Sequence, residues 1–132
     1  MAAILEGRSV HPETSLVISP GSRQALAMLT ETGGLKSLIE AGARILECTC
    51  GPCIGIGQSP PTDGISLRTF NRNFKGRSGT LGAKLFLSSP EVAAVSALEG
   101  EITDPRSFGE PIDMAVPETF PNIDHLFQEP PK

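Results

Sequence analysis

The sequence predicts an α/β fold with three α/β/α layers and a mostly parallel sheet, because strand-like and helix-like segments alternate along it. Short apolar runs rich in β-branched residues, such as residues 15–19, alternate with segments whose apolar residues recur at helical spacing, such as residues 35–41. This alternation is typical of strands joined by crossover helices in a parallel sheet. The chain of 132 residues is long enough for one domain, and its 14 Gly and 12 Pro predict many turns.

The predicted elements follow in order from the N-terminus. The first ten residues are expected to hold the end of a helix, with Gly7 as its cap. Ser22 is a good N-cap, and either Ser88 or Ser89 can cap a helix whose first position is Pro90. The predicted strands lie at residues 15–19, 43–48, 65–70 and 83–87, and the other predicted helices at residues 21–31, 35–41 and 90–99.

From residue 105 onward the composition changes. Six of the 12 prolines fall in the last 28 residues, with acidic residues between them. Such a segment is expected to be extended or partly disordered. The sequence therefore predicts an α/β domain at residues 1–104, followed by a Pro-rich acidic tail or linker at residues 105–132.

Composition argues against several classes of function. A net charge of −4 and the lack of Trp and Tyr argue against nucleic-acid binding. No apolar run approaches the roughly 20 residues that cross a bilayer, so no membrane partner is expected, and no secretory signal is evident. Three cysteines within six residues do not form a disulfide framework. They indicate metal or redox chemistry in a reducing compartment, so we expect a cytoplasmic protein.

Cys50 and Cys53 form a C-x-x-C motif in a loop rich in Gly and Pro, and several interpretations of it stay open. A turn at this spacing points two thiolates the same way, which suits one metal ion or cluster. A thioredoxin-like redox site needs a helix after the motif, but residues 54–61 are poor helix formers. A zinc ribbon needs a second ligand pair, for which only the isolated His11 and His125 are present. A further interpretation is that the thiols are only buried apolar groups, which suits Cys48 because it continues an apolar strand, but not the two cysteines of the Gly- and Pro-rich loop.

A second loop, at residues 71–82, is polar and basic. Four cations lie within ten residues, namely Arg68, Arg72, Lys75 and Arg77. They form either a solvated basic turn or a site for an anion. Both this loop and the cysteine loop follow predicted strands. Since ligands gather beyond the carboxyl ends of parallel strands, we expect the two loops to lie side by side.

These two motifs together resemble the aconitase / 3-isopropylmalate dehydratase large subunit family. The first is C-G-P-C-I-G at residues 50–55, and the second is N-R-N-F-K-G-R at residues 71–77. Segments at residues 17–22 and 87–94 fit the same family. The resemblance covers residues 1–104 and implies that they form part of the third α/β domain of such an enzyme.

The resemblance implies a 4Fe–4S cluster and a hydro-lyase that removes and returns water on a citrate-like or isopropylmalate-like hydroxy acid. It implies that Cys50 and Cys53 are two of three cluster ligands. It places Asn71 next to the cluster, and Arg72 and Arg77 on the carboxylates of the substrate. Arginine suits this role because its planar, permanently charged fork matches a carboxylate.

The family pattern is incomplete in this sequence. The third cysteine ligand is expected outside the chain, with Cys48 as a possible substitute if the strand persists to Cys50. The family's acid and base groups have no counterpart here, so no catalytic residue is predicted.

The expected partners are the remaining domains, or a small swivelling-domain subunit, and a tricarboxylate or hydroxy-dicarboxylate substrate. The isolated chain is expected to be inactive. Alternatives are a stand-alone iron–sulfur or metal-binding module and a thiol–disulfide oxidoreductase.

Overall fold

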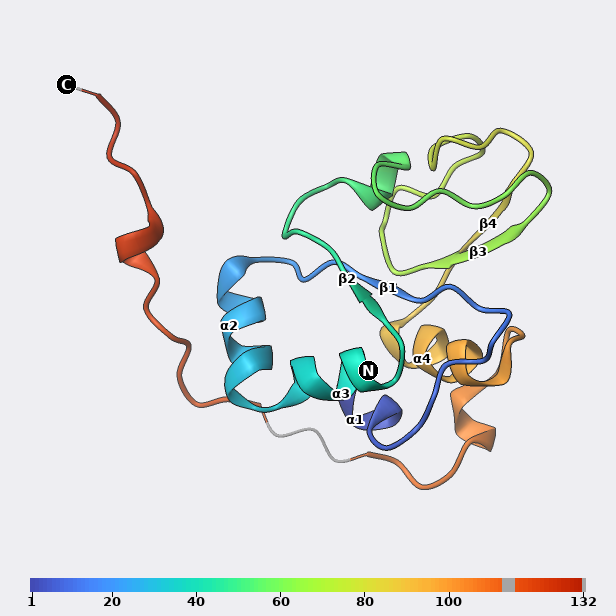
Figure 1. Cartoon of the computed structure of the whole chain (residues 1–132), viewed down its shortest axis with the longest axis horizontal. Coiled ribbons are helices and arrows are strands. Elements are labelled where there is room, and N and C mark those ends of the chain that lie inside the picture. Colours follow the sequence, from blue (N-terminus) through green and yellow to red (C-terminus); the bar gives the residue numbers. More distant parts are fainter. Residues whose placement is uncertain (113–115, 132) are drawn as a thin grey trace.

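The helices and strands follow the predicted order in the computed structural model of the chain, which describes residues 1–112 and 116–131 (Figure 1). The helices are α1 (Ala2–Leu5), α2 (Arg23–Glu31), α3 (Gly34–Glu40) and α4 (Pro90–Glu99), and the strands are β1 (Val17–Ile18), β2 (Arg44–Ile45), β3 (Ile65–Arg68) and β4 (Lys84–Leu87). Three short 3₁₀ helices are η1 (Pro52–Ile54), η2 (Pro105–Ser107) and η3 (Asp124–Leu126).

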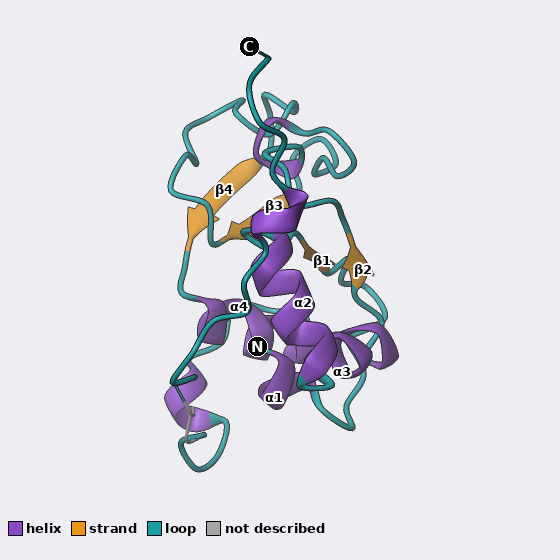
Figure 2. Cartoon of the chain, turned by 90° about the vertical axis from the view of Figure 1, so that its left-hand side faces the viewer, coloured by secondary structure: helices purple, strands orange, loops and turns teal. Residues whose placement is uncertain are grey.

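The four strands confirm the α/β class and the parallel pairing. β1 pairs with β2, and β3 pairs with β4, both in parallel. They form two separate two-stranded sheets, whereas the sequence pattern predicted one (Figure 2). The first pair is shorter than predicted, because Pro20 and Gly21 follow β1 and the chain after β2 bends toward the Gly- and Pro-rich cysteine loop.

The predicted helix starts are confirmed by their caps. The Ser22 hydroxyl accepts a hydrogen bond from the Ala25 N–H at 3.0 Å. Of the two candidates for the last helix, Ser89 is the cap, and its hydroxyl accepts from the Val92 N–H at 3.3 Å. Each cap satisfies one of the N–H groups that the first turn of a helix leaves unpaired.

The main core lies where α1, α3 and α4 meet the β1–β2 pair (Figures 1 and 2). Leu5 is 0% exposed and Leu38 2%. Burying a leucine stabilises the fold by about 2–3 kcal/mol. Small side chains complete the cluster, namely Ala41, Ala43 and Ala94. This core fixes the position of β1 and β2, and the chain runs from the end of β2 into the cysteine loop.

The described part of the C-terminal segment contacts the first third of the chain through two side chains. Arg8 stacks over the Phe108 ring at 4.6 Å, and the Gln24 side chain donates a hydrogen bond to the Pro121 carbonyl at 2.7 Å. Residues 116–131 pass the outer side of α2 (Figure 1). Residues 113–115 and 132 of the predicted tail lie outside the described residues. In the part of the chain that the structure describes, no helix has the length and apolar character needed to span a bilayer.

Candidate functional site

The cysteine loop makes a tight turn around η1. Pro52 opens this short helix, and Gly55 ends it with a φ of +87°. The Gly51 carbonyl accepts hydrogen bonds from the N–H groups of Ile54 and Ile56, at 3.1 and 2.9 Å. A helix of three residues, in place of a long one, follows Cys50, as expected from the poor helix formers there.

The loop brings two thiols together. Cys50 is exposed, whereas Cys53 is 4% exposed. Hydrogen bonding from the Arg77 side chain lowers the pKa of Cys53, and hydrogen bonding from Cys50 adds to this effect, while burial opposes it. The thiolate of Cys53, which is the form that binds metals, is therefore favoured.

The second loop is packed against the first, which confirms the predicted proximity of the two. Ser78 is 0% exposed, and its carbonyl accepts a hydrogen bond from the Ser59 hydroxyl at 2.8 Å. The same carbonyl faces the Cα of Gly55 so closely that a Cβ built there would lie 2.3 Å from it. The loops meet although the strands before them, β2 and β3, belong to different sheets.

The three family-motif residues of the second loop have different environments. Arg77 is partly buried, and its Nε has no hydrogen-bond partner among the described residues. Asn71 and Arg72 are exposed, and within residues 1–112 and 116–131 they form no hydrogen bond or ion pair between side chains. The structure thus places Arg77 beside Cys53 and leaves Asn71 and Arg72 at the surface of the loop.

Arg68 was wrongly grouped with a possible solvated turn by the sequence pattern. It is 6% exposed, and its two terminal nitrogens donate to the carbonyls of Cys53 at 3.3 Å and of Pro52 at 3.1 Å. One feature of the sequence could have indicated that Arg68 is buried. Alternation along β3 puts Arg68 on the same face as Ser66, away from Leu67 between them.

Cys48 lies apart from this arrangement. β2 ends at Ile45, so no strand carries Cys48 and Cys50 on one side. Across the described ranges, no group of three or more His, Cys, Asp and Glu side chains is placed to hold a metal ion. His11 and His125 thus add no ligand to the cysteines there.

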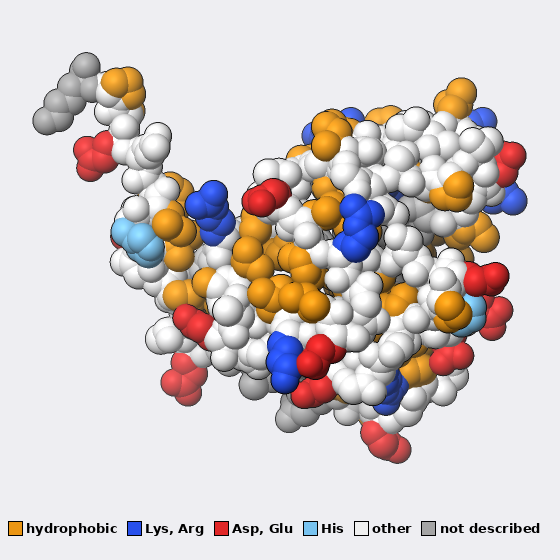
Figure 3. Space-filling model, in the orientation of Figure 1, with side chains coloured by type: hydrophobic (Ala, Val, Ile, Leu, Met, Phe, Trp, Pro, Cys, Tyr) orange, Lys and Arg blue, Asp and Glu red, His pale blue; other side chains and the backbone are white. Residues whose placement is uncertain are grey.

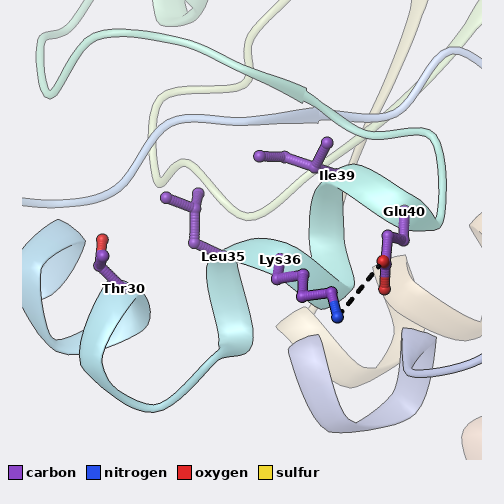
Figure 4. A pocket seen from close by; sticks show the side chains of 5 residues that line it. All are labelled: Thr30, Leu35, Lys36, Ile39 and Glu40. Atoms are coloured by element: carbon purple, nitrogen blue, oxygen red, sulfur yellow. Dashed lines mark ion pairs between the residues drawn. The ribbon is translucent and has the colours of Figure 1, made fainter.

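A separate hollow of about 400 Å³ lies between α2 and α3 and is open to solvent. Leu35 and Ile39 line it, and an exposed ion pair joins Lys36 and Glu40 beside it at 3.6 Å (Figure 4). Figure 3 shows apolar side chains gathered in the middle of this face of the molecule. The hollow offers no nucleophile and no buried charge, so it is a weaker candidate site than the cysteine loop.

Comparisons of the sequence with known proteins agree on one family. A sequence profile of the aconitase family (aconitate hydratase) matches residues 1–100. Over 108 residues the chain is 44% identical to 3-isopropylmalate dehydratase large subunit 2 of Archaeoglobus fulgidus, which covers 81% of this chain and 26% of that protein. It is 40% identical over 104 residues to the methanogen homoaconitase large subunit of Methanocaldococcus jannaschii, covering 78% and 25% of the two chains.

A eukaryotic relative shows the same pattern. The chain is 39% identical over 125 residues to the mitochondrial homoaconitase of Candida parapsilosis, which covers 93% of this chain and 18% of that protein. The chain therefore spans about a quarter, or less, of the length of these relatives.

Proposed function

The chain belongs to the aconitase family, and from this premise we propose that it supplies the cysteine loop and the carboxylate-binding loop of an iron–sulfur hydro-lyase. The observation that carries the proposal is the meeting of Cys50, Cys53 and Arg77 where the two loops pack together. The proposed substrate is a citrate-like or isopropylmalate-like hydroxy acid, in keeping with relatives named 3-isopropylmalate dehydratase and homoaconitase.

The residues present fit a 4Fe–4S cluster. Cys50 and Cys53 are the proposed ligands, because they share one tight loop and because interaction with Arg77 and Cys50 lowers the pKa of the Cys53 thiol. The Nε of Arg77 is buried and has no partner among the described residues, so this side chain beside Cys53 has a donor available. A 4Fe–4S cluster held there, with a third ligand from outside the chain, would supply a Lewis acid for the removal and return of water.

The proposed substrate contacts come from the second loop. Arg72 is exposed and has no carboxylate partner in the described parts of the chain, so its guanidinium is available to a substrate carboxylate. Arg77 is proposed to orient a second carboxylate while it stabilises the Cys53 thiolate. Asn71 begins the same loop, and its amide is proposed to donate to the cluster or to the substrate.

The rest of the enzyme is proposed to come from other domains or from a small subunit that carries the acid and base groups. Large apolar side chains around the loops support this, because Ile65 and Phe74 are each 63% exposed and Leu81 is 70% exposed. Relatives of about three times this length are named as large subunits. We propose a cytoplasmic location and no activity for the chain alone.

Anaerobic reconstitution with iron, sulfide and a small external thiol tests the cluster ligands. We expect visible cluster absorbance that is lost in Cys50→Ser and in Cys53→Ser and kept in the matched control Cys48→Ser. Equal iron and sulfide content in all four proteins would contradict the assignment. Loss in Cys48→Ser as well would favour the alternative, a stand-alone module with three ligands of its own.

A chimera tests the hydro-lyase assignment. The matching segment of the Archaeoglobus fulgidus relative, which is 44% identical, is replaced by this chain. We expect dehydratase activity that falls by more than about a hundredfold in Arg72→Lys and Arg77→Lys chimeras, because lysine cannot form the bidentate contact. A chimera whose activity does not depend on these arginines would rule out the carboxylate role.

A further inference from the structure

Arg68 is a buried cation whose role the proposed chemistry does not explain. It is the last residue of β3, and its guanidinium points into the cysteine loop. Besides the carbonyls of Pro52 and Cys53, it contacts the Ser66 hydroxyl, to which its Nε donates at 3.0 Å. All three nitrogens of the fork are therefore engaged, and the guanidinium cannot rotate without breaking at least one of these bonds.

This arrangement contains no carboxylate. The ion pairs found in residues 1–112 and 116–131 are Lys36–Glu40 and Arg106–Asp104, so the partners of Arg68 are neutral oxygens and the Phe70 ring at 5.9 Å. Burying a charge without a counter-charge is costly unless its hydrogen bonds are fully satisfied. A residue that served only to fill this space would not need the charge.

We propose that Arg68 is a positioning residue, which clamps the carbonyls of Pro52 and Cys53 and so fixes the direction in which Cys53 presents its sulfur. This inference rests on the proposed function, in which that sulfur binds an iron of the cluster. The Cys53 carbonyl and thiol belong to one residue, so holding the carbonyl restricts the peptide plane from which the side chain projects.

The buried Arg68 and the partly buried Arg77 then have different tasks. Hydrogen bonding from Arg77 is the main cause of the lowered pKa of Cys53, to which the charge of Arg68 adds less, whereas the hydrogen bonds of Arg68 go to the backbone. The task of Arg68 requires a planar fork, because two carbonyls and one hydroxyl must be reached from one rigid group. A lysine ammonium is a point donor on a flexible stem, and it cannot hold the same three oxygens together.

Amide hydrogen exchange on the metal-free chain tests the clamp without any cluster. In Arg68→Ala we expect the amides of residues 53–56 to exchange at least about tenfold faster, since bonds to a charged group are lost, while those of α4 keep their rates. Ethylguanidinium added to this variant is expected to restore slow exchange, and ethylammonium is not. Arg23→Ala is the matched control, because Arg23 is exposed at the start of α2.

Cluster retention provides the second readout. After reconstitution, Arg68→Ala and Arg68→Lys are expected to lose visible absorbance to an iron chelator at least about tenfold faster than the unaltered chain. Wild-type exchange rates in Arg68→Ala, or equal acceleration in the loop and in α4, would overturn the clamp. Should Arg68→Ala not fold, Arg68→Lys decides the question by the same two measurements.

The two proposals fail in different ways. If the exchange data are as expected but even the unaltered chain retains no iron, the clamp holds and the cluster assignment fails. If the cluster forms and is equally stable in all variants with unchanged exchange, the cluster assignment holds and the clamp is wrong.

Discussion

Gly55 shows how one residue joins the two loops of the site. Its φ of +87° lies in the left-handed region, which an L side chain rarely adopts, and its Cα faces the Ser78 carbonyl. A side chain at this position would therefore separate the loops as well as strain the backbone. Gly57 shares the left-handed backbone, with a φ of +79°, but a Cβ there would meet only Leu46 at an ordinary 3.5 Å.

The different surroundings of the two glycines predict that alanine lowers the free energy of unfolding by different amounts at the two positions. Gly57→Ala is expected to lower the free energy of unfolding by about 1–2 kcal/mol, from backbone strain alone. Gly55→Ala is expected to lower it by roughly a further 1–3 kcal/mol, because the Ser78 backbone must move. Urea denaturation of both variants measures the difference. If both variants lost the same free energy of unfolding, the close approach of the two loops at Gly55 would contribute nothing to stability.

Arg68 shows, at the scale of one residue, what a local sequence pattern misses. Its place in a run of cations predicted either a solvated turn or an anion site, because a local pattern counts charges and does not see which carbonyls a distant loop presents. Only the packing of η1 against β3 shows that this guanidinium is buried.

At the scale of elements, α4 is the helix that the sequence describes best. Its predicted and observed bounds agree, from Pro90 to Glu99, and its first turn carries Glu91. Hydrogen bonding from the Ser89 side chain, and then from the backbone N–H of Glu91 itself, lowers the pKa of the Glu91 carboxyl below its ordinary 4.5. A negative charge here also interacts favourably with the positive end of the helix dipole.

This carboxylate predicts a pH dependence of stability. A lowered pKa in the folded state means that the stabilisation is present above about pH 4.5 and is lost as the pH falls through the folded-state value. Glu91→Gln is therefore expected to be less stable than the unaltered chain at pH 7 and to approach it in acid. Urea denaturation from pH 7 down into acid measures the difference in the free energy of unfolding between Glu91→Gln and the unaltered chain. The matched control is Glu99→Gln, at the opposite end of α4, where no loss at pH 7 is expected. A gap for Glu91→Gln that did not change with pH would contradict the assignment.

At the scale of the whole molecule, the chain divides into a helical core and a loop region built on the β3–β4 pair. The core contains Leu5 and Leu38, whereas the loop region buries Cys53, Arg68 and Ser78. The segment after η2 lies outside both parts, and among its described residues Pro121 accepts a hydrogen bond from Gln24 of α2.

This division predicts that the tail contributes little stability. A chain ending at Phe108 keeps the stacking with Arg8 and η2, and loses the Gln24–Pro121 bond. Its free energy of unfolding is expected to change by about 1 kcal/mol or less, the size of one partly buried hydrogen bond. Thermal unfolding of the shortened chain beside Gln24→Ala measures this. A loss of several kcal/mol would mean that residues 109–132 form part of the folded domain.

The sequence by itself determined the order of helices and strands, the cap at Ser22, the choice of Ser88 or Ser89 as the cap of α4, the α/β class and the family. These features follow from local periodicity, from side chains that bond within one turn, and from two motifs of adjacent residues. Only the tertiary structure decided the division of the strands into two pairs, the meeting of Cys53 with Arg77, and the burial of Arg68. Each of these depends on contacts between segments some 15 to 30 residues apart, whose relative placement is set by packing and by the satisfaction of buried polar groups rather than by neighbouring residues.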